Sequence, residues 1–336
     1  MIERLLTESR VLVSYIYFSL LPDITQMSLF HDDITISRSL FSPITTMLSL
    51  LTHLLLISTA IYNIQKHSLY SFGVIFFYLG HSLESTFIAL ELMHEHRNYV
   101  PLAGILISTL YFLDKLVTFK KLNPNLVFGV ICFCFASSTF IRSLSWTSYP
   151  QLIMTQAKKN PESPRTIYAL GLWNYSEMLR LNETKVADTN AQKAAENFNR
   201  VSKLDDKSVY PLLATIRLID QLEQRVDKKY VQDVTRRIQA NFVSNQDSAA
   251  LSNFVQCYSN NYCTIEPLEI ESIILAVKES TKISLNNKLT ILYNYSFALG
   301  SAGHNDLSEK YMFSANKLYQ NQHPDRRSAQ EESITQ

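Results

Sequence analysis

The chain reads Glu91-Leu-Met-His-Glu-His-Arg-Asn-Tyr-Val-Pro101 between two segments that are apolar enough to cross a membrane. Two carboxylates, two histidines and an arginine therefore stand where the chain would leave the bilayer. A charged side chain beside hydrocarbon is costly, about 2.5–3.5 kcal/mol for a central arginine on insertion scales, and such groups tend to be functional. This polar segment (residues 91–101) is the first candidate for a functional site.

Charge density separates the chain into two halves. Residues 1–148 contain nine Lys and Arg and nine Asp and Glu, whereas residues 149–336 contain 22 and 21. Because charge is balanced in each half, the composition gives no support to nucleic-acid binding. The mean hydropathy of −0.02 averages an apolar, aromatic first half and an ordinary soluble second half. With only seven glycines and no glycine-rich phosphate loop, the sequence predicts an all-α fold.

The first half contains four windows that are long and apolar enough to span a bilayer. They are residues 44–64, 69–90, 99–119 and 126–141. The segment 10–21 is too short to cross, and its basic flank and the Pro22-Asp23 stop indicate a helix that lies in the interface. The predicted organisation is therefore a juxtamembrane segment (1–43), a four-helix transmembrane region (44–148), a helical domain (149–324) and a disordered tail (325–336).

Lysine and arginine positions give the expected orientation. Lys66, Lys115, Lys120 and Lys121 fall on one side of the four windows, and three dispersed arginines, Arg38, Arg97 and Arg142, fall on the other. The lysine-rich side is the better cytoplasmic signal. The polar segment and everything after Trp146 are then expected outside the cytoplasm.

The cysteines form two pairs with different expected roles. Cys132 and Cys134 lie in an apolar window and are expected to be buried small hydrophobes. Cys257 and Cys263 flank a polar turn, and they form a disulfide if that domain faces an oxidising compartment.

The second half has helical periodicity. Helices are expected over residues 165–181, 190–204, 209–222, 288–299 and 307–319. The last two keep the spacing of a tetratricopeptide unit at Leu292, Tyr295, Leu299, Gly303, Ser308, Met312 and Ala315. A short array of helical hairpins is the prediction, and an irregular helical bundle is the alternative.

Three features together carry a family resemblance. They are Glu3-Arg-Leu-Leu-Thr-Glu-Ser-Arg-Val-Leu12, then Glu95-His-Arg-Asn-Tyr-Val-Pro101, then four spans followed by tetratricopeptide-like helices. The chain resembles, over essentially its whole length, the C-terminal half of bacterial polyprenyl-phosphate-sugar glycosyltransferases of the GT-C type. The eukaryotic relatives of that family are transmembrane and tetratricopeptide-containing O-mannosyltransferases. Arg97, Tyr99 and Pro101 match a short family motif, and Val100 stands where leucine is more usual.

The resemblance implies a multi-pass protein of the bacterial inner membrane with a periplasmic C-terminal domain. Its activity would be transfer of a sugar from a polyprenyl-phosphate carrier to an acceptor, presented by the helical repeats and expected to be a protein. Family members begin with a large multi-span half whose first outward loop bears acidic residues that bind metal or act as base. This chain starts at Met1 in what resembles a late outward loop. We therefore expect the catalytic carboxylate to lie outside it, in a longer reading frame or a partner, with any divalent metal.

The resemblance also implies a role for each of several residues. Arg97, with Arg10, would hold the lipid phosphate, because a guanidinium offers a planar donor fork and keeps its charge. Tyr99 and Glu95 would orient that phosphate. The alternative for Arg97 is an edge arginine that extends to water.

Other ionisable residues are expected to line a protein cavity. These are Glu84, His81, Glu91 and His94. Glu91, His94 and Glu95 have metal-ligand chemistry at one-turn spacing, but no second ligand set accompanies them, so no metal site is predicted. His53 is expected to be a hydrogen-bonded interior histidine, and Asp32-Asp33 a cap or a solvated turn.

Two functions follow. The first is a glycosyltransferase of this lineage, with the membrane, a polyprenyl-phosphate-linked sugar and an acceptor protein as partners. The second is a non-enzymatic, membrane-anchored scaffold that docks proteins on its helical domain.

Overall fold

The part of the chain that the structure describes is built from helices. The computed structural model describes residues 1–21, 23–32, 34–83, 85–86, 91–181, 185–258 and 263–322, and no β-strand occurs among them. The all-α prediction is confirmed for these residues. They belong to two units, Met1–Thr166 and Ile167–Gln336, each described by itself below. The predicted tail, 325–336, lies outside the described residues.

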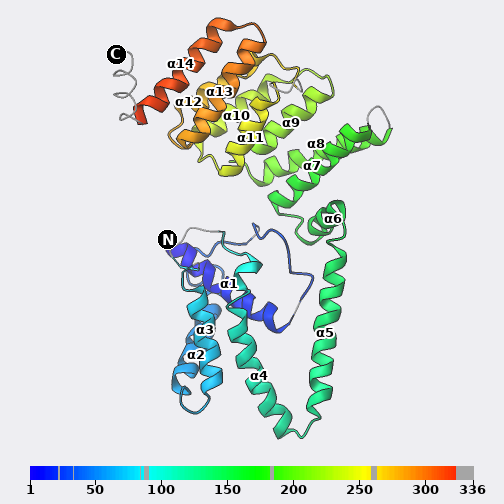
Figure 1. Ribbon diagram of the computed structural model, residues 1–336, viewed down its shortest axis with the longest axis vertical. Helices are drawn as coiled ribbons and strands as arrows, with labels where there is room; N and C mark the ends of the chain where they lie inside the picture. The colour runs from blue at the N-terminus through cyan, green and yellow to red at the C-terminus, as the bar shows by residue number, and fades with distance from the viewer. Residues whose placement is uncertain are drawn as a thin grey trace, which may run out of the picture. The chain divides into compact units, whose positions relative to one another are not determined.

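Unit 1 contains the polar segment and the helices before and after it in the chain (Figure 1). They are α1 (Ile2–Leu20), α2 (Thr45–Tyr62), α3 (Ser68–His81), the 3₁₀ turn η1 (Glu95–Asn98), α4 (Leu102–Phe119), α5 (Pro124–Leu144) and α6 (Tyr149–Lys159).

Three helices of unit 1 are long and apolar enough to cross a membrane, namely α2, α4 and α5. The sequence predicts a fourth span over residues 69–90, but α3 covers only 14 residues. At 1.5 Å per residue that is about 21 Å, short of a hydrocarbon core of about 30 Å. The end of α3 coincides with a tertiary contact, since the His81 ring stacks on Tyr15 with centroids 5.3 Å apart. Residues 84 and 87–90 lie outside the described residues.

α3 and α4 approach each other closely at two glycines. A Cβ added to Gly73 or to Gly104 would lie 2.3 Å from the carbonyl oxygen of the other glycine. Ser108 Oγ, one turn along α4, donates a hydrogen bond to Tyr70 O at 3.0 Å. Small residues that let two backbones touch are the usual basis of helix pairing in membranes. α1 packs Val11 and Tyr15 against this helix pair, at Phe77 of α3 and Ile105 of α4.

α5 has no buried residue. Cys132 and Cys134 are exposed on it, so the prediction that they are buried is wrong. Hydropathy records that a window is apolar and cannot tell whether its side chains meet protein or lipid. Phe133 and Phe140, which are also exposed on α5, show the same pattern. A helix whose side chains are largely apolar and exposed along most of its length has the character of a membrane span.

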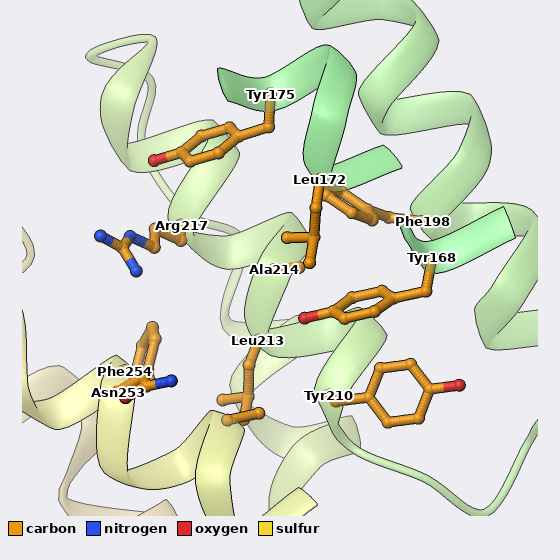
Figure 2. Close-up of a pocket in the computed structure, with 11 residues that line it drawn as sticks. Tyr168, Leu172, Tyr175, Phe198, Tyr210, Leu213, Ala214, Arg217, Asn253 and Phe254 are labelled. Atoms are coloured by element: carbon orange, nitrogen blue, oxygen red, sulfur yellow. The ribbon is translucent and has the colours of Figure 1, made fainter. Parts of the chain in front are cut away.

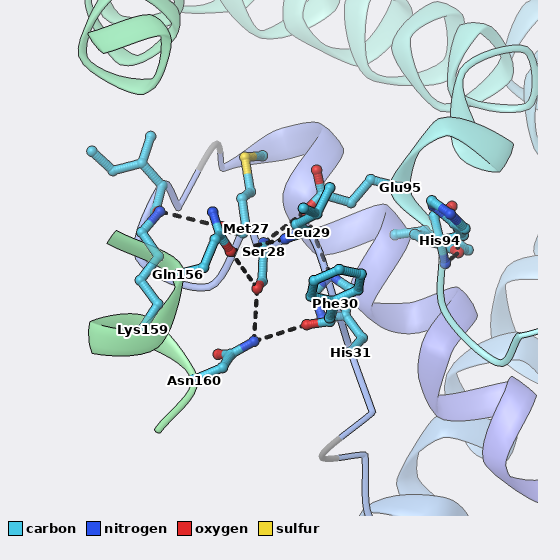
Figure 3. Close-up of polar contacts among 12 residues, drawn as sticks. Met27, Ser28, Leu29, Phe30, His31, His94, Glu95, Gln156, Lys159 and Asn160 are labelled. Atoms are coloured by element: carbon cyan, nitrogen blue, oxygen red, sulfur yellow. Dashed lines mark hydrogen bonds and ion pairs between the residues drawn. The ribbon is translucent and has the colours of Figure 1, made fainter. Parts of the chain in front are cut away.

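α6 belongs to unit 1, so the boundary falls after Thr166 and not at the predicted 148/149. The cause is a set of hydrogen bonds to the loop that follows α1 (Figure 3). Gln156 Oε1 accepts from Ser28 Oγ (2.7 Å) and Leu29 N (2.9 Å). Asn160 Nδ2 donates to Ser28 Oγ (2.8 Å) and Phe30 O (2.9 Å).

Asp32 acts as a helix cap, one of the two roles expected for it. Its carboxylate accepts hydrogen bonds from Ser163 Oγ (2.5 Å) and from the backbone N of Arg165 (3.0 Å), at the start of α7. A carboxylate at a helix N-terminus satisfies otherwise unpaired N–H groups. Asp33 lies outside the described residues.

Unit 2 continues from α7 and is also helical. Its elements are α7 (Pro164–Leu181), α8 (Lys185–Leu204), α9 (Tyr210–Gln221), α10 (Lys228–Ala240), α11 (Asn245–Gln256), the 3₁₀ turn η2 (Pro267–Ile270), α12 (Glu271–Glu279), α13 (Leu285–Ser301) and α14 (Asn305–Gln322). The main apolar core runs from α9 to α14. A disulfide joins Cys257 to Cys263 after α11. Gly303, with a φ of 87°, makes the turn between α13 and α14.

Replacing Gly171 in α7 with alanine is expected to destabilise unit 2 by about 1–3 kcal/mol, the usual cost of overpacking. The new Cβ would lie 2.6 Å from Phe198 Cε1 and 3.2 Å from Asn197 Cβ. Phe198 is only 1% exposed, so its ring has little room to move. Urea unfolding followed by Trp173 fluorescence, in a Trp146→Phe background, measures the effect. Gly300→Ala is the control, since its Cβ would meet only a serine side chain at 3.2 Å; equal stability of the two variants would contradict the packing argument.

Candidate functional site

A cavity of about 620 Å³ opens beside the polar segment of unit 1. It is lined by Ser28, Leu29, His94, Glu95, His96, Asn98, Tyr99, Leu102, Arg142 and Trp146. These residues come from the loop after α1, from η1, from the N-terminal end of α4 and from the C-terminal end of α5. We call this space the Glu95 cavity. A smaller cavity of about 170 Å³ adjoins it and shares Glu95, Asn98, Leu102 and Arg142.

Glu95 belongs to the network of polar contacts drawn in Figure 3. Its Oε1 accepts a hydrogen bond from Ser28 N (3.0 Å) and lies 3.5 Å from His31 Nε2. Its Oε2 pairs with Arg142 Nη2. Burial acts to raise the pKa of Glu95, but the contacts with His31 and Arg142 outweigh it and hold that pKa below its usual range. The carboxylate is therefore ionised at neutral pH and fixes the arginine at the cavity wall.

Two cations lie next to that carboxylate. Arg142 Nη1 has a sulfur acceptor, Met27 Sδ, at 3.0 Å. Lys159 Nζ donates to the backbone carbonyls of Ile24 and Met27. Burial, and then the charge of Arg142, lower the pKa of Lys159. A thioether is a weak hydrogen-bond acceptor, so Met27 satisfies the Nη1 donor of Arg142 only weakly.

The 3₁₀ turn η1 is held by α1. The Tyr15 hydroxyl donates to His94 O (3.0 Å) and accepts from His94 N (2.8 Å). Asn98 Nδ2 donates to Ser19 Oγ at 3.3 Å. The His94 and His96 rings lie with centroids 4.0 Å apart, and burial, followed by the charge of His96, lowers the pKa of His94. The cavity thus presents two histidines on a fixed backbone.

The residues predicted to bind phosphate divide between the cavity and its surroundings. Glu95 and Tyr99 line the Glu95 cavity. Arg97 and Arg10 are not among its lining residues; Arg97 Nη1 donates to Glu91 O, and Arg10 Nη1 donates to Thr35 O (2.6 Å). The arginine that reaches the cavity is Arg142, which the sequence analysis used only to assign orientation.

The predicted cavity residues divide in the same way. His94 lines the cavity, whereas His81 is buried at 3% exposure, with its Nε2 3.3 Å from Asn98 Oδ1. Glu91 is exposed and pairs with Arg165 at 2.7 Å. Glu84 lies outside the described residues. Within the described residues no group of three or more His, Cys, Asp or Glu side chains is placed to hold a metal ion.

His53 is a hydrogen-bonded interior histidine, and that prediction is confirmed. Its Nδ1 lies 2.7 Å from the Tyr78 hydroxyl and its Nε2 lies 2.7 Å from Ser9 O. The histidine therefore ties α2 to α1 and α3.

Glu8 is a buried carboxyl that the sequence analysis did not single out. It is 2% exposed on α1 and pairs with Arg4 at 2.9 Å. Burial raises the pKa of Glu8 to about 7. Its spacing from Val11 and Tyr15 puts it on the buried face of the helix, and this i, i+3, i+7 pattern is the signal that would have found it.

Glu8 is expected to make stability fall as pH rises. A carboxyl whose folded pKa is raised from 4.5 to about 7 favours folding at low pH, and this contribution is lost as pH rises through 7. The shift corresponds to about 3 kcal/mol between pH 4 and pH 9. Glu8→Gln should remove this slope in thermal unfolding of the detergent-solubilised protein, whereas Glu3→Gln, at an exposed site of the same helix, should keep it. A wild-type slope in Glu8→Gln would show that another group titrates.

Comparisons with known proteins give no relative: no family model matches the chain, and no curated protein or solved structure matches it.

Proposed function

We propose that this is an integral membrane protein whose Glu95 cavity binds the phosphate of a polyprenyl-phosphate-linked sugar, as part of a GT-C-type glycosyltransferase. The observation that carries the proposal is Arg142, a fixed guanidinium in a cavity whose other walls include Tyr99, Leu102 and Trp146. Guanidinium groups match phosphate oxygens. Tyrosine and tryptophan are enriched where a membrane meets water.

The network leaves one edge of Arg142 available for an anion. Its Nη2 is held by Glu95, and its Nη1 faces the sulfur of Met27. A phosphate oxygen would replace that weak acceptor without breaking the pair with Glu95. Lys159 adds a second positive charge close by. In this arrangement Glu95 positions the arginine, and the arginine contacts the ligand.

Sugar transfer would use the same contact. As the glycosidic bond breaks, negative charge grows on the leaving lipid phosphate. A guanidinium already in place stabilises that charge more than it stabilises the bound donor, which is the condition for acceleration. The proposal also includes Arg97, which matches the family motif and is close to Glu95 in the sequence, as a second contact to the phosphate.

The proposal puts unit 2 outside the cytoplasm, in the periplasm of a bacterium. The disulfide between Cys257 and Cys263 supports this side, because disulfides persist in oxidising compartments and are rare in the cytosol. The acceptor would be a protein held by the helices of unit 2.

Binding of farnesyl phosphate and of farnesol tests the proposal, since the two probes share a chain and differ in the phosphate. The chain has two tryptophans, and Trp146 lines the cavity, so its fluorescence in a Trp173→Phe background reports binding. We expect the detergent-solubilised protein to bind farnesyl phosphate at least about tenfold more tightly than farnesol. Equal affinities would overturn the phosphate site.

The second candidate function is a membrane-anchored scaffold with tetratricopeptide-like hairpins. It is favoured by α13 and α14, which pair closely around the fully buried Tyr295 and Ala315. Gly303 at the turn also fits the predicted spacing. Met312 departs from it, since that side chain is 40% exposed. A scaffold would bind protein and show no preference for farnesyl phosphate over farnesol.

A further inference from the structure

Unit 2 contains a second cavity, of about 160 Å³, between α7, α8, α9 and α11 (Figure 2). Its walls are mainly aromatic and aliphatic, with Tyr168, Phe198, Leu213 and Phe254 among them. We call it the aromatic pocket. It lies within one unit and is separate from the Glu95 cavity.

Polar groups gather on one side of the aromatic pocket. In Figure 2 the hydroxyls of Tyr168 and Tyr175, the guanidinium of Arg217 and the amide of Asn253 lie towards the left of the view, away from Phe198 and the Tyr210 hydroxyl. Tyr175 and Arg217 also interact with each other. All four groups are able to donate hydrogen bonds. Such a convergence of donors favours a ligand that supplies acceptors.

Arg217 gives the aromatic pocket its charge. It is the one charged residue among those that line the pocket, and its Nε is buried without a hydrogen-bond partner. The nearby carboxylates are engaged elsewhere: Asp247 accepts from Val209 N (2.7 Å), and Asp220 accepts from Thr264 Oγ1 (2.5 Å). Within the described residues Arg217 forms no ion pair, so its guanidinium can pair with the charge of an anionic ligand.

The size of the pocket limits the rest of the ligand. A cavity of about 150 Å³ lined by apolar side chains holds one benzene ring, and the aromatic pocket is close to that volume at about 160 Å³. One compact apolar group therefore fills it. A phosphate monoester would bring about two negative charges to a single cation, whereas a carboxylate brings one.

We propose that the aromatic pocket binds a carboxylate that carries one compact apolar group. Arg217 and Asn253 receive the carboxylate, and the ring walls receive the apolar group. Two sources have this chemistry, a free small acid and the C-terminal residue of a peptide. The inference is independent of the Glu95 cavity and of the sugar-transfer proposal.

Four probes test it on the full chain in detergent: 3-phenylpropionate and its amide, and acetyl-Ala-Ala-Phe and its C-terminal amide. Calorimetry should show at least one acid binding about tenfold or more tightly than its matched amide, because a hydrogen bond to a charged group is lost. Tighter binding of the peptide acid would identify a peptide C-terminus as the source, and tighter binding of 3-phenylpropionate a small acid. Equal binding of acids and amides, or binding of none of the four, would overturn the proposal.

Two variants distinguish binding of the probes in the aromatic pocket from their partition into the detergent micelle. Arg217→Gln should abolish the preference for the acid, and Arg180→Gln, at an exposed residue paired with Glu177 on α7, should keep it. Asn253→Asp is a second variant at an exposed position, so folding is not at risk. Its carboxylate would compete for Arg217 and should weaken acid binding about tenfold. Preference retained in both pocket variants would also overturn the proposal.

Discussion

Replacing Gly104 with valine is expected to disrupt the packing of α3 against α4, at a cost of about 3 kcal/mol or more. A Cβ at this position would lie 2.3 Å from Gly73 O and 3.0 Å from Phe77 N. Both are backbone atoms, so no side-chain rotation relieves the clash and the helices must separate. Separation would also break the buried hydrogen bond from Ser108 Oγ to Tyr70 O.

The consequence reaches the Glu95 cavity, because α4 starts at Leu102, one of its lining residues. The fraction of protein that stays monodisperse after heating in detergent measures the loss. Gly129→Val on α5 is the matched control, since a Cβ there meets no described atom within 4 Å. If Gly104→Val loses no more monodisperse protein than Gly129→Val on heating, the close approach of α3 and α4 does not carry the stability of this region.

Helix type and the three long apolar spans were predictable because each depends on a local pattern. The end of α3 was missed because the mean hydropathy of residues 69–90 hides the polar residues that follow His81 in the sequence, Ser82, Glu84 and Ser85. The helix end also coincides with a contact to Tyr15, far away in the sequence, which no local pattern predicts. The exposure of Cys132 was not predictable for a related reason: hydropathy does not report which neighbours surround an apolar window.

The same distinction, between local sequence patterns and tertiary contacts, applies to the residues of the site. Glu95, Tyr99 and His94 were predicted to be functional because they are close together in one short segment. Arg142 was missed as a residue of the cavity wall because it is 47 residues from Glu95 in the sequence. The aromatic pocket was missed altogether: Tyr168 and Arg217 each resemble an ordinary helix residue until α7 and α9 are brought together.

Replacing Arg142 with glutamine is expected to have two separable effects. The first is on ligand: affinity for farnesyl phosphate should fall about tenfold or more, towards that of farnesol, because the charged donor is gone. The second is on stability, since Glu95, with a side chain only 23% exposed, would lose its ion pair. Leaving that carboxylate without its arginine should cost about 1.5–3 kcal/mol.

A second substitution separates these effects. In the double variant Arg142→Gln, Glu95→Gln the unpaired carboxylate is also removed, so thermal stability should recover while phosphate binding stays lost. Glu95→Gln alone keeps Arg142 and leaves it an amide oxygen as hydrogen-bond acceptor, so the preference for farnesyl phosphate over farnesol should remain. Arg38→Gln, at an exposed arginine of the loop before α2, serves as the charge-matched control and should change neither property.

Phosphate preference that survives in Arg142→Gln but is lost in Arg97→Gln would assign the phosphate contact to Arg97, the arginine of the family motif. Preference that survives in both variants would overturn the proposed phosphate site, because no other arginine among the described residues lines the cavity.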